Sequence, residues 1–237
     1  GLWVGNFAVL MVVGQLGGGI IGSHIIAIRI EAFSFMPGFA MGVAAATLAG
    51  QYLGAGRPDL AKAAVIKCML IAALVMAAFG AVFMYVPNTL VGWLSSQPAH
   101  RAAAPIAVAM SGLVQIPFAM AIVFRGAMRG AGDVRAAFII TWTMTYAVRL
   151  PLVYLLSGIA IPLAPALAET LQALGVAVVT TDSGGSALAN PFWAVWKPPT
   201  PEWGLWAVWA AMMFELSLRG LIFSLRFCQG GWLKKAV

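Results

Sequence analysis

Residues 60–86 read LAKAAVIKCMLIAALVMAAFGAVFMYV, and no charged residue interrupts the stretch from Cys68 to its end. A helix needs about 20 mainly apolar residues to cross the roughly 30 Å hydrocarbon core of a bilayer. The stretch therefore predicts a membrane-spanning helix. Pro87-Asn88 follows directly and predicts the end of that helix.

The composition of the whole chain agrees with a membrane protein. Of its 237 residues, 62% are hydrophobic and 9% are charged, whereas charged residues supply about a quarter of a usual soluble domain. These values argue against a soluble globular domain, a disordered chain and a nucleic-acid-binding module. The formal net charge of +7 is therefore interpreted through membrane topology, and we expect no nucleic-acid partner.

Further apolar runs occur along the chain, separated by glycines, prolines and charged residues. The first run is too short to cross a bilayer at about 1.5 Å per residue, and the others are long enough. We predict an all-α bundle of about six transmembrane helices, the first of them partial. Because the chain starts at Gly1 within an apolar run, we expect it to be a fragment that begins inside a helix. The predicted spans are residues 2–16, 20–53, 60–86, 102–124, 136–156 and 203–227.

Residues 159–202 differ from the rest, since turn-forming residues prevent a long apolar run. We predict a loop there, with a short interfacial helix over 165–174, while 1–158 and 203–237 form the membrane lobe. Most of the 14 basic residues fall near loops 54–60 and 125–135 and near the C-terminus. Basic loops remain on the cytoplasmic side, so we expect these three regions in the cytoplasm and 159–202 outside it.

One face of the second predicted span carries small residues around a carboxylate. A carboxylate inside a membrane helix costs roughly 2.5–3.5 kcal/mol, so we expect Glu31 to face protein. Two interpretations of Glu31 stay open, a place on an ion or substrate pathway and a structural ion pair. Close packing against another helix explains the glycines. The face consists of Glu31, Ser34, Gly38, Gly42, Ala45 and Ala49, which recur at three and four residues.

The last two predicted spans carry opposite charges at similar depths. Arg149 lies about as far into its span as Glu215 does, and Arg219 follows Glu215 by one helical turn. We predict a salt bridge between Arg149 and Glu215 that Arg219 shares. It is either a structural network or a switchable network coupled to an ion. Tyr146 precedes Arg149 by one turn and is a further pathway candidate.

Three prolines inside predicted spans indicate bends. Proline has no backbone N–H, so Pro37, Pro117 and Pro151 each leave a carbonyl one turn earlier without its usual partner. Gln115 lies beside Pro117 and is a candidate for the pathway. The two cysteines and two histidines are scattered singly, so the sequence predicts no metal site, no disulfide, no catalytic residue and no cofactor.

Four segments resemble the multidrug and toxic compound extrusion (MATE) family of transporters. Residues 22–61, GSHIIAIRIEAFSFMPGFAMGVAAATLAGQYLGAGRPDLA, are similar to the region of its seventh and eighth helices. Residues 124–136, FRGAMRGAGDVRA, resemble the loop after the tenth helix. Residues 148–152, VRLPL, resemble a motif of the eleventh helix, and 230–232, GGW, resemble the C-terminal end.

The resemblance implies a fold of twelve helices in two six-helix lobes, of which this chain is the C-terminal lobe with a truncated first helix. It implies export of cationic drugs or other organic compounds in exchange for sodium or protons. The implied setting is the bacterial inner membrane, and the implied partners are the bilayer, the N-terminal lobe and small organic cations. Some members carry an acidic residue in the tenth helix, but the matching residues 116–119, IPFA, contain none.

Two alternatives remain. A flippase for lipid-linked precursors, from the same superfamily, is expected to have a more cationic cavity, which the orientations of Arg29 and Arg149 would reveal. A membrane-embedded enzyme would need acid, base or metal groups that converge at one depth.

Overall fold

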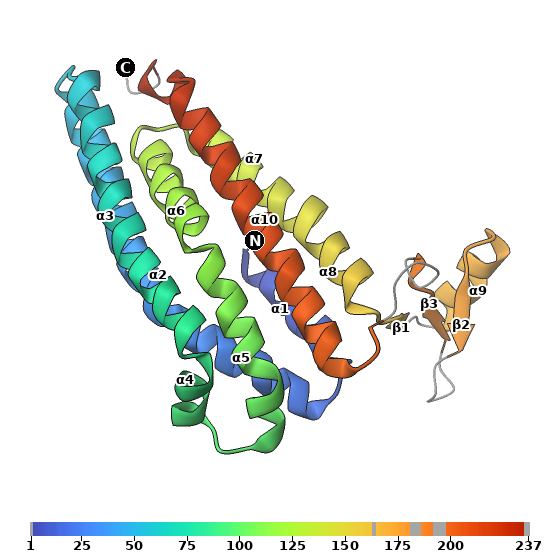
Figure 1. Ribbon diagram of the computed structural model, residues 1–237. Coiled ribbons are helices and arrows are strands. Elements are labelled where there is room, and N and C mark those ends of the chain that lie inside the picture. Colours follow the sequence, from blue (N-terminus) through green and yellow to red (C-terminus); the bar gives the residue numbers. More distant parts are fainter. Residues whose placement is uncertain (1, 163–164, 181–185, 192–197, 235–237) are drawn as a thin grey trace.

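Long apolar helices run side by side through most of the computed structural model, which describes residues 2–162, 165–180, 186–191 and 198–234 (Figure 1). Four helical segments in these ranges are long and apolar enough to cross a membrane, and a bent pair makes a fifth. The segments are α2 (Gly18–Gly54), α3 (Pro58–Tyr85), the pair α5 (Pro98–Leu113) and α6 (Gln115–Gly130), the continuous α7 (Val134–Thr143), η1 (Met144–Arg149) and α8 (Leu150–Ser157), and α10 (Pro201–Cys228).

Shorter elements complete the described chain. The apolar helix α1 (Leu2–Gly14) is too short to span, as its sequence predicts. Helix α4 (Pro87–Leu94) precedes α5, and the 3-10 turn η3 (Gly231–Lys234) follows α10. The all-α bundle of about six helical segments, one of them partial, is therefore the observed architecture.

A small antiparallel sheet, which the sequence did not predict, lies at the end of α8 (Figure 1). Its strands are β1 (Ile161–Pro162), β2 (Val178–Thr180) and β3 (Ser186–Leu188), in the order β1-β3-β2, and helix α9 (Pro165–Ala173) stands beside them. Strands of two or three residues are too short to show an alternating pattern, which is why the sequence predicts a loop here. The location of 159–202 relative to a membrane stays a prediction.

The two glycine-rich loops form the same helix-ending motif. After α2, the N–H of Arg57 donates to the carbonyl of Tyr52, and Gly56 has a φ of 69°. After α6, the N–H of Asp133 donates to the carbonyl of Met128 around Gly132, whose φ is 82°. These are Schellman motifs, which favour glycine at the left-handed position. They turn α2 tightly into α3, and α6 into α7.

Pro117 coincides with the sharpest break in the bundle. Helices α5 and α6 meet at 59° across Val114, and Pro117 in the first turn of α6 cannot donate to the carbonyl of Leu113. By contrast, α2 continues as one helix across Pro37. Pro151 lies at the start of α8, directly after the six-residue π-helical turn η1.

The small-residue face of α2 packs against α6, as its pattern predicts. Ser34, Gly38, Gly42, Ala45 and Ala49 are all buried. A Cβ atom at Gly126 of α6 would clash with the backbone carbonyl of Gly42, and one at Gly130 would clash with that of Ala46. The two backbones therefore touch without side chains between them.

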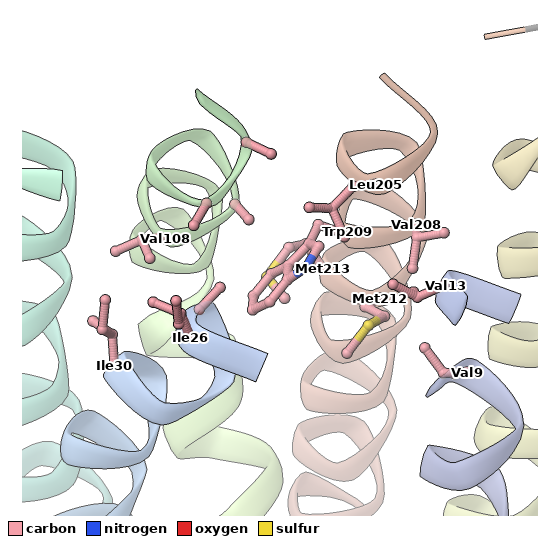
Figure 2. Packing of buried hydrophobic residues seen from close by; sticks show 14 of the residues in the cluster. Val9, Val13, Ile26, Ile30, Val108, Leu205, Val208, Trp209, Met212 and Met213 are labelled. Atoms are coloured by element: carbon pink, nitrogen blue, oxygen red, sulfur yellow. The ribbon is translucent and has the colours of Figure 1, made fainter. Parts of the chain in front are cut away.

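Apolar side chains fill two cores, one toward each end of the bundle. Figure 2 shows the core at the end where α1 joins α2, in which Trp209 of α10 lies among Ile26, Val108, Leu205 and Met213. The second core lies between α2, α3 and α6 and extends to Phe227 and Trp232. Both glycine-rich loops and the C-terminal end of α10 lie at this second end (Figure 1).

The contact between α2 and α6 predicts a stability difference. Gly126→Ala should lower the melting temperature in detergent, because overpacking of a tight contact costs about 1–3 kcal/mol. The matched control is Gly54→Ala at the end of α2, where a new Cβ would meet no atom within 4 Å. Equal melting temperatures for the two variants, measured by thermal unfolding, would contradict the contact.

Candidate functional site: a buried charge network

The ion pair predicted between Arg149 and Glu215 is present. Arg149 is the last residue of the π turn η1, and its guanidinium donates from Nε and Nη2 to Oε2 of Glu215 at 3.0 and 2.7 Å. Arg149 is 6% exposed and Glu215 is fully buried. The pair thus joins the α7–α8 segment to α10 in the interior of the bundle.

Glu215 also holds Arg219, so one carboxylate serves two cations. Nε of Arg219 donates to Oε1 of Glu215 at 2.7 Å, one turn along α10. Nη2 of Arg219 donates to Oγ1 of Thr145 at 3.0 Å, and Nη1 of Arg149 donates to Oδ1 of Asn6 at 3.1 Å. The network therefore ties α1, η1 and α10 together.

Asn6 and Thr145 are members of this network that the sequence analysis missed. Asn6 is a polar residue within the apolar helix α1, and such residues usually find a polar partner inside a membrane protein. That rule would have identified Asn6 as a candidate member of a polar network. Thr145 carries no comparable signal, because threonine in a helix commonly bonds its own backbone, as Thr145 also does to the carbonyl of Thr141.

Glu31 faces the protein interior, as predicted, because its side chain is only 7% exposed. Its Oε1 has no hydrogen-bond partner among the described residues. Ser34 donates its hydroxyl to the backbone carbonyl of Glu31 at 2.7 Å and not to the carboxylate. Arg29, two residues earlier, is exposed on the other face of α2.

Gln115 and Tyr146 do not belong to the charge network around Glu215. Gln115 is 1% exposed at the break between α5 and α6, where Nε2 donates to the carbonyl of Ser111 at 3.0 Å and Oε1 has no partner in the described part of the chain. Its side chain packs toward Gly80 of α3. Tyr146 is half-buried and its ring lies 4.3 Å from that of Trp142, which is exposed.

The histidines and cysteines lie outside the network. Nε1 of Trp209 donates to Nδ1 of His24 at 3.1 Å within the core, and His100 bonds Ser95 at 2.8 Å. Within the described residues, no three His, Cys, Asp or Glu side chains gather as metal ligands would. The charged groups that the site brings together are therefore the carboxylate of Glu215 and the guanidiniums of Arg149 and Arg219, with the buried carboxylate of Glu31 on α2.

Comparison with known proteins places this architecture in a family. The family model described as MatE matches residues 2–155. Over 133 residues the chain is 29% identical to the probable multidrug resistance protein NorM of Thermotoga maritima, a match that covers 56% of this chain and 29% of that protein. Over 156 residues it is 31% identical to the probable NorM of Shewanella oneidensis, which covers 65% and 34%.

A third relative gives the same result. The multidrug resistance protein PmpM of Pseudomonas aeruginosa is 28% identical over 146 residues, which are 62% of this chain and 31% of PmpM. The chain thus spans about a third of the length of the curated relatives that it matches.

The shared carboxylate predicts non-additive losses of stability. Glu215→Gln should be the costlier single change, because it leaves two buried guanidiniums without a carboxylate, and breaking such a pair costs about 3–5 kcal/mol. Arg149→Met should cost less, since Arg219 still pairs with Glu215. The double variant should lose less than the sum of the two, as thermal unfolding in detergent would measure.

The exposed pair of Arg57 and Asp59 is the control for this cycle. Its side chains are 57% and 64% exposed, so Asp59→Asn should leave the melting temperature nearly unchanged. If the losses of stability for Arg149→Met and Glu215→Gln were additive, the interaction between the two residues would not contribute to stability.

Proposed function

Because this chain belongs to the MatE family, whose members are transporters and not enzymes, we propose that it is one lobe of a secondary active antiporter. The proposed antiporter exports cationic drugs or other organic compounds in exchange for sodium or protons. The names of the relatives support the drug class, and they describe proteins about three times longer than the matched region. A second lobe is therefore part of the proposal, and the substrate pathway lies between the two lobes.

The proposed membrane topology follows the distribution of charge. The turns after α2 and α6 and the end of α10 lie at one end of the bundle, and these regions carry most of the basic residues (Figure 1). We propose that this end faces the cytoplasm of a bacterial cell. The α9 and β-strand region at the end of α8 then lies outside.

The carboxylate of Glu31 is the observation that supports ion coupling. Burying a carboxylate oxygen without a hydrogen-bond partner lowers the stability of the fold. A residue that only packed against its neighbours would not need this carboxylate. The ionised form of Glu31 attracts Arg149 and competes with Glu215 for it. A proton or a sodium ion on Glu31 removes that attraction and leaves Arg149 fully with Glu215 and Asn6.

This competition gives the coupling ion a mechanical effect. Arg149 lies on η1, and its partners lie on α1 and α10, so a change of partner alters the contacts of three segments at once. A ligand shifts a conformational equilibrium only by such a difference in interaction between two states. We propose that Glu31 provides that difference and that Gln115 and Tyr146 line the substrate route.

The positions of Arg29 and Arg149, which were expected to distinguish a flippase from a drug antiporter, do not support the flippase. Arg149 pairs with Glu215 in the interior and with the exposed Asn6, and Arg29 is exposed on the opposite face of α2 from Glu31. Neither arginine is placed with the other to form a cationic cavity.

The first test is Glu31→Gln in the full-length transporter, which removes the charge but keeps the shape. We expect loss of drug export driven by an ion gradient, with unchanged membrane insertion and equal or higher thermal stability. The matched control is Arg29→Gln, an exposed change two residues away, which should leave export intact. Normal gradient-driven export of ethidium by Glu31→Gln, measured in everted vesicles, would reject the coupling role.

The second test concerns the need for a second lobe. We expect the 237-residue chain alone, reconstituted in vesicles, to insert but to give no ethidium transport under an imposed proton or sodium gradient. A cavity between two lobes cannot be alternately opened and closed by one of them. Robust gradient-dependent transport by this chain alone would overturn the two-lobe proposal.

A further inference from the structure

A groove with two arginines lies beside the contact between α2 and α6. Its volume is about 510 Å³, and its walls are formed by Phe39, Val43 and Thr47 of α2, Arg125 and Arg129 of α6, and Val134 of α7. The glycine contact described above closes its floor, because the two backbones touch there. The groove is distinct from the network around Glu215.

Among the residues that the structure describes, no side chain compensates the positive charge of this groove. No described acidic side chain lines it, and neither Arg125 nor Arg129 forms a hydrogen bond or ion pair with another described residue. Arg125 and Arg129 both line the groove, so two like charges stand in one place, and an anion bound between them would lower their repulsion.

Another arginine at the same end of the bundle shows how such a charge is usually satisfied. Nη2 of Arg226 donates to Oδ2 of Asp133 at 2.8 Å, and this pair joins the end of α10 to the turn after α6. Arg125 has no such carboxylate in the described part of the chain, although it is half-buried. The difference marks the groove as a place for an external anion.

The walls of the groove are suited to a hydrocarbon chain. Phe39, Val43 and Val134 are 45%, 67% and 52% exposed. Arg129 lies in the last turn of α6 and Arg125 one turn earlier on the same face, so their charges stand near the end of the membrane-spanning segment. An amphiphile with an anionic head matches both parts of the groove.

We propose that this groove binds an anionic phospholipid of the bilayer, with its phosphate on Arg125 and Arg129 and an acyl chain along Phe39 and Val43. Basic pockets between helices near the cytoplasmic surface attract anionic headgroups, and the groove lies at the end of the bundle assigned to that side. The bound phosphate supplies the missing negative charge. The site goes beyond the proposed transport activity and does not depend on Glu31.

Native mass spectrometry of the purified chain tests the proposal. Phosphatidylglycerol and phosphatidylethanolamine with identical acyl chains are compared, and glycerol phosphate serves as a headgroup without chains. We expect the chain to retain phosphatidylglycerol in preference. Arg125→Gln with Arg129→Gln should lower that retention by roughly tenfold or more, since each cation near the surface contributes to binding.

Two further variants separate the groove from general surface charge and from misfolding. Lys62→Gln with Arg135→Gln removes two exposed charges from the same end of the bundle, outside the groove, and should keep the preference. Thr47→Trp at an exposed position fills the groove without a change of charge and should lower retention.

Three results would overturn the proposal. Equal losses in the groove pair and the control pair would assign the effect to net charge. Equal binding of glycerol phosphate would make the groove a site for a free anion. A dimer of the wild-type chain that Arg125→Gln with Arg129→Gln dissociates, without retained lipid, would make the groove a protein contact.

Discussion

A single carboxylate, that of Glu215, organises the charged interior of this lobe. Its two oxygens each accept hydrogen bonds from a different arginine, and those arginines extend to Thr145 and Asn6. Inside an apolar bundle, each of these charges would be costly alone. The positions of α1, η1 and α10 are therefore fixed relative to one another by electrostatics as well as by packing.

The apolar cores and the charge network have different effects on the fold. Hydrophobic side chains are compatible with many arrangements of helices, because lipid is as apolar as they are. Polar groups buried between helices are much more selective, since each needs a partner at one place. The close approach of α2 and α6 at Gly42 and Gly126 adds a second selective contact at the other end.

Much of this arrangement was predictable because the membrane simplifies the problem. The lengths of the apolar runs predicted the spans. Because a buried charge is costly alone, Arg149 was expected to pair with Glu215. The spacing of the small residues predicted that Glu31 faces inward. The strands β1 to β3 were not predictable, since their two or three residues carry no periodicity. Gln115 packs toward Gly80 rather than toward the charge network, and only the tertiary structure reveals that direction.

The π turn η1 has a consequence for comparisons between relatives. A π turn accommodates one residue more than an α-helical turn, and one residue corresponds to about 100° of rotation around the axis. The faces of α7 and α8 are therefore out of phase, with Arg149 at the junction. An alignment to a protein with a regular helix at this place needs a one-residue gap within 144–149, and patterns on either side belong to separate registers.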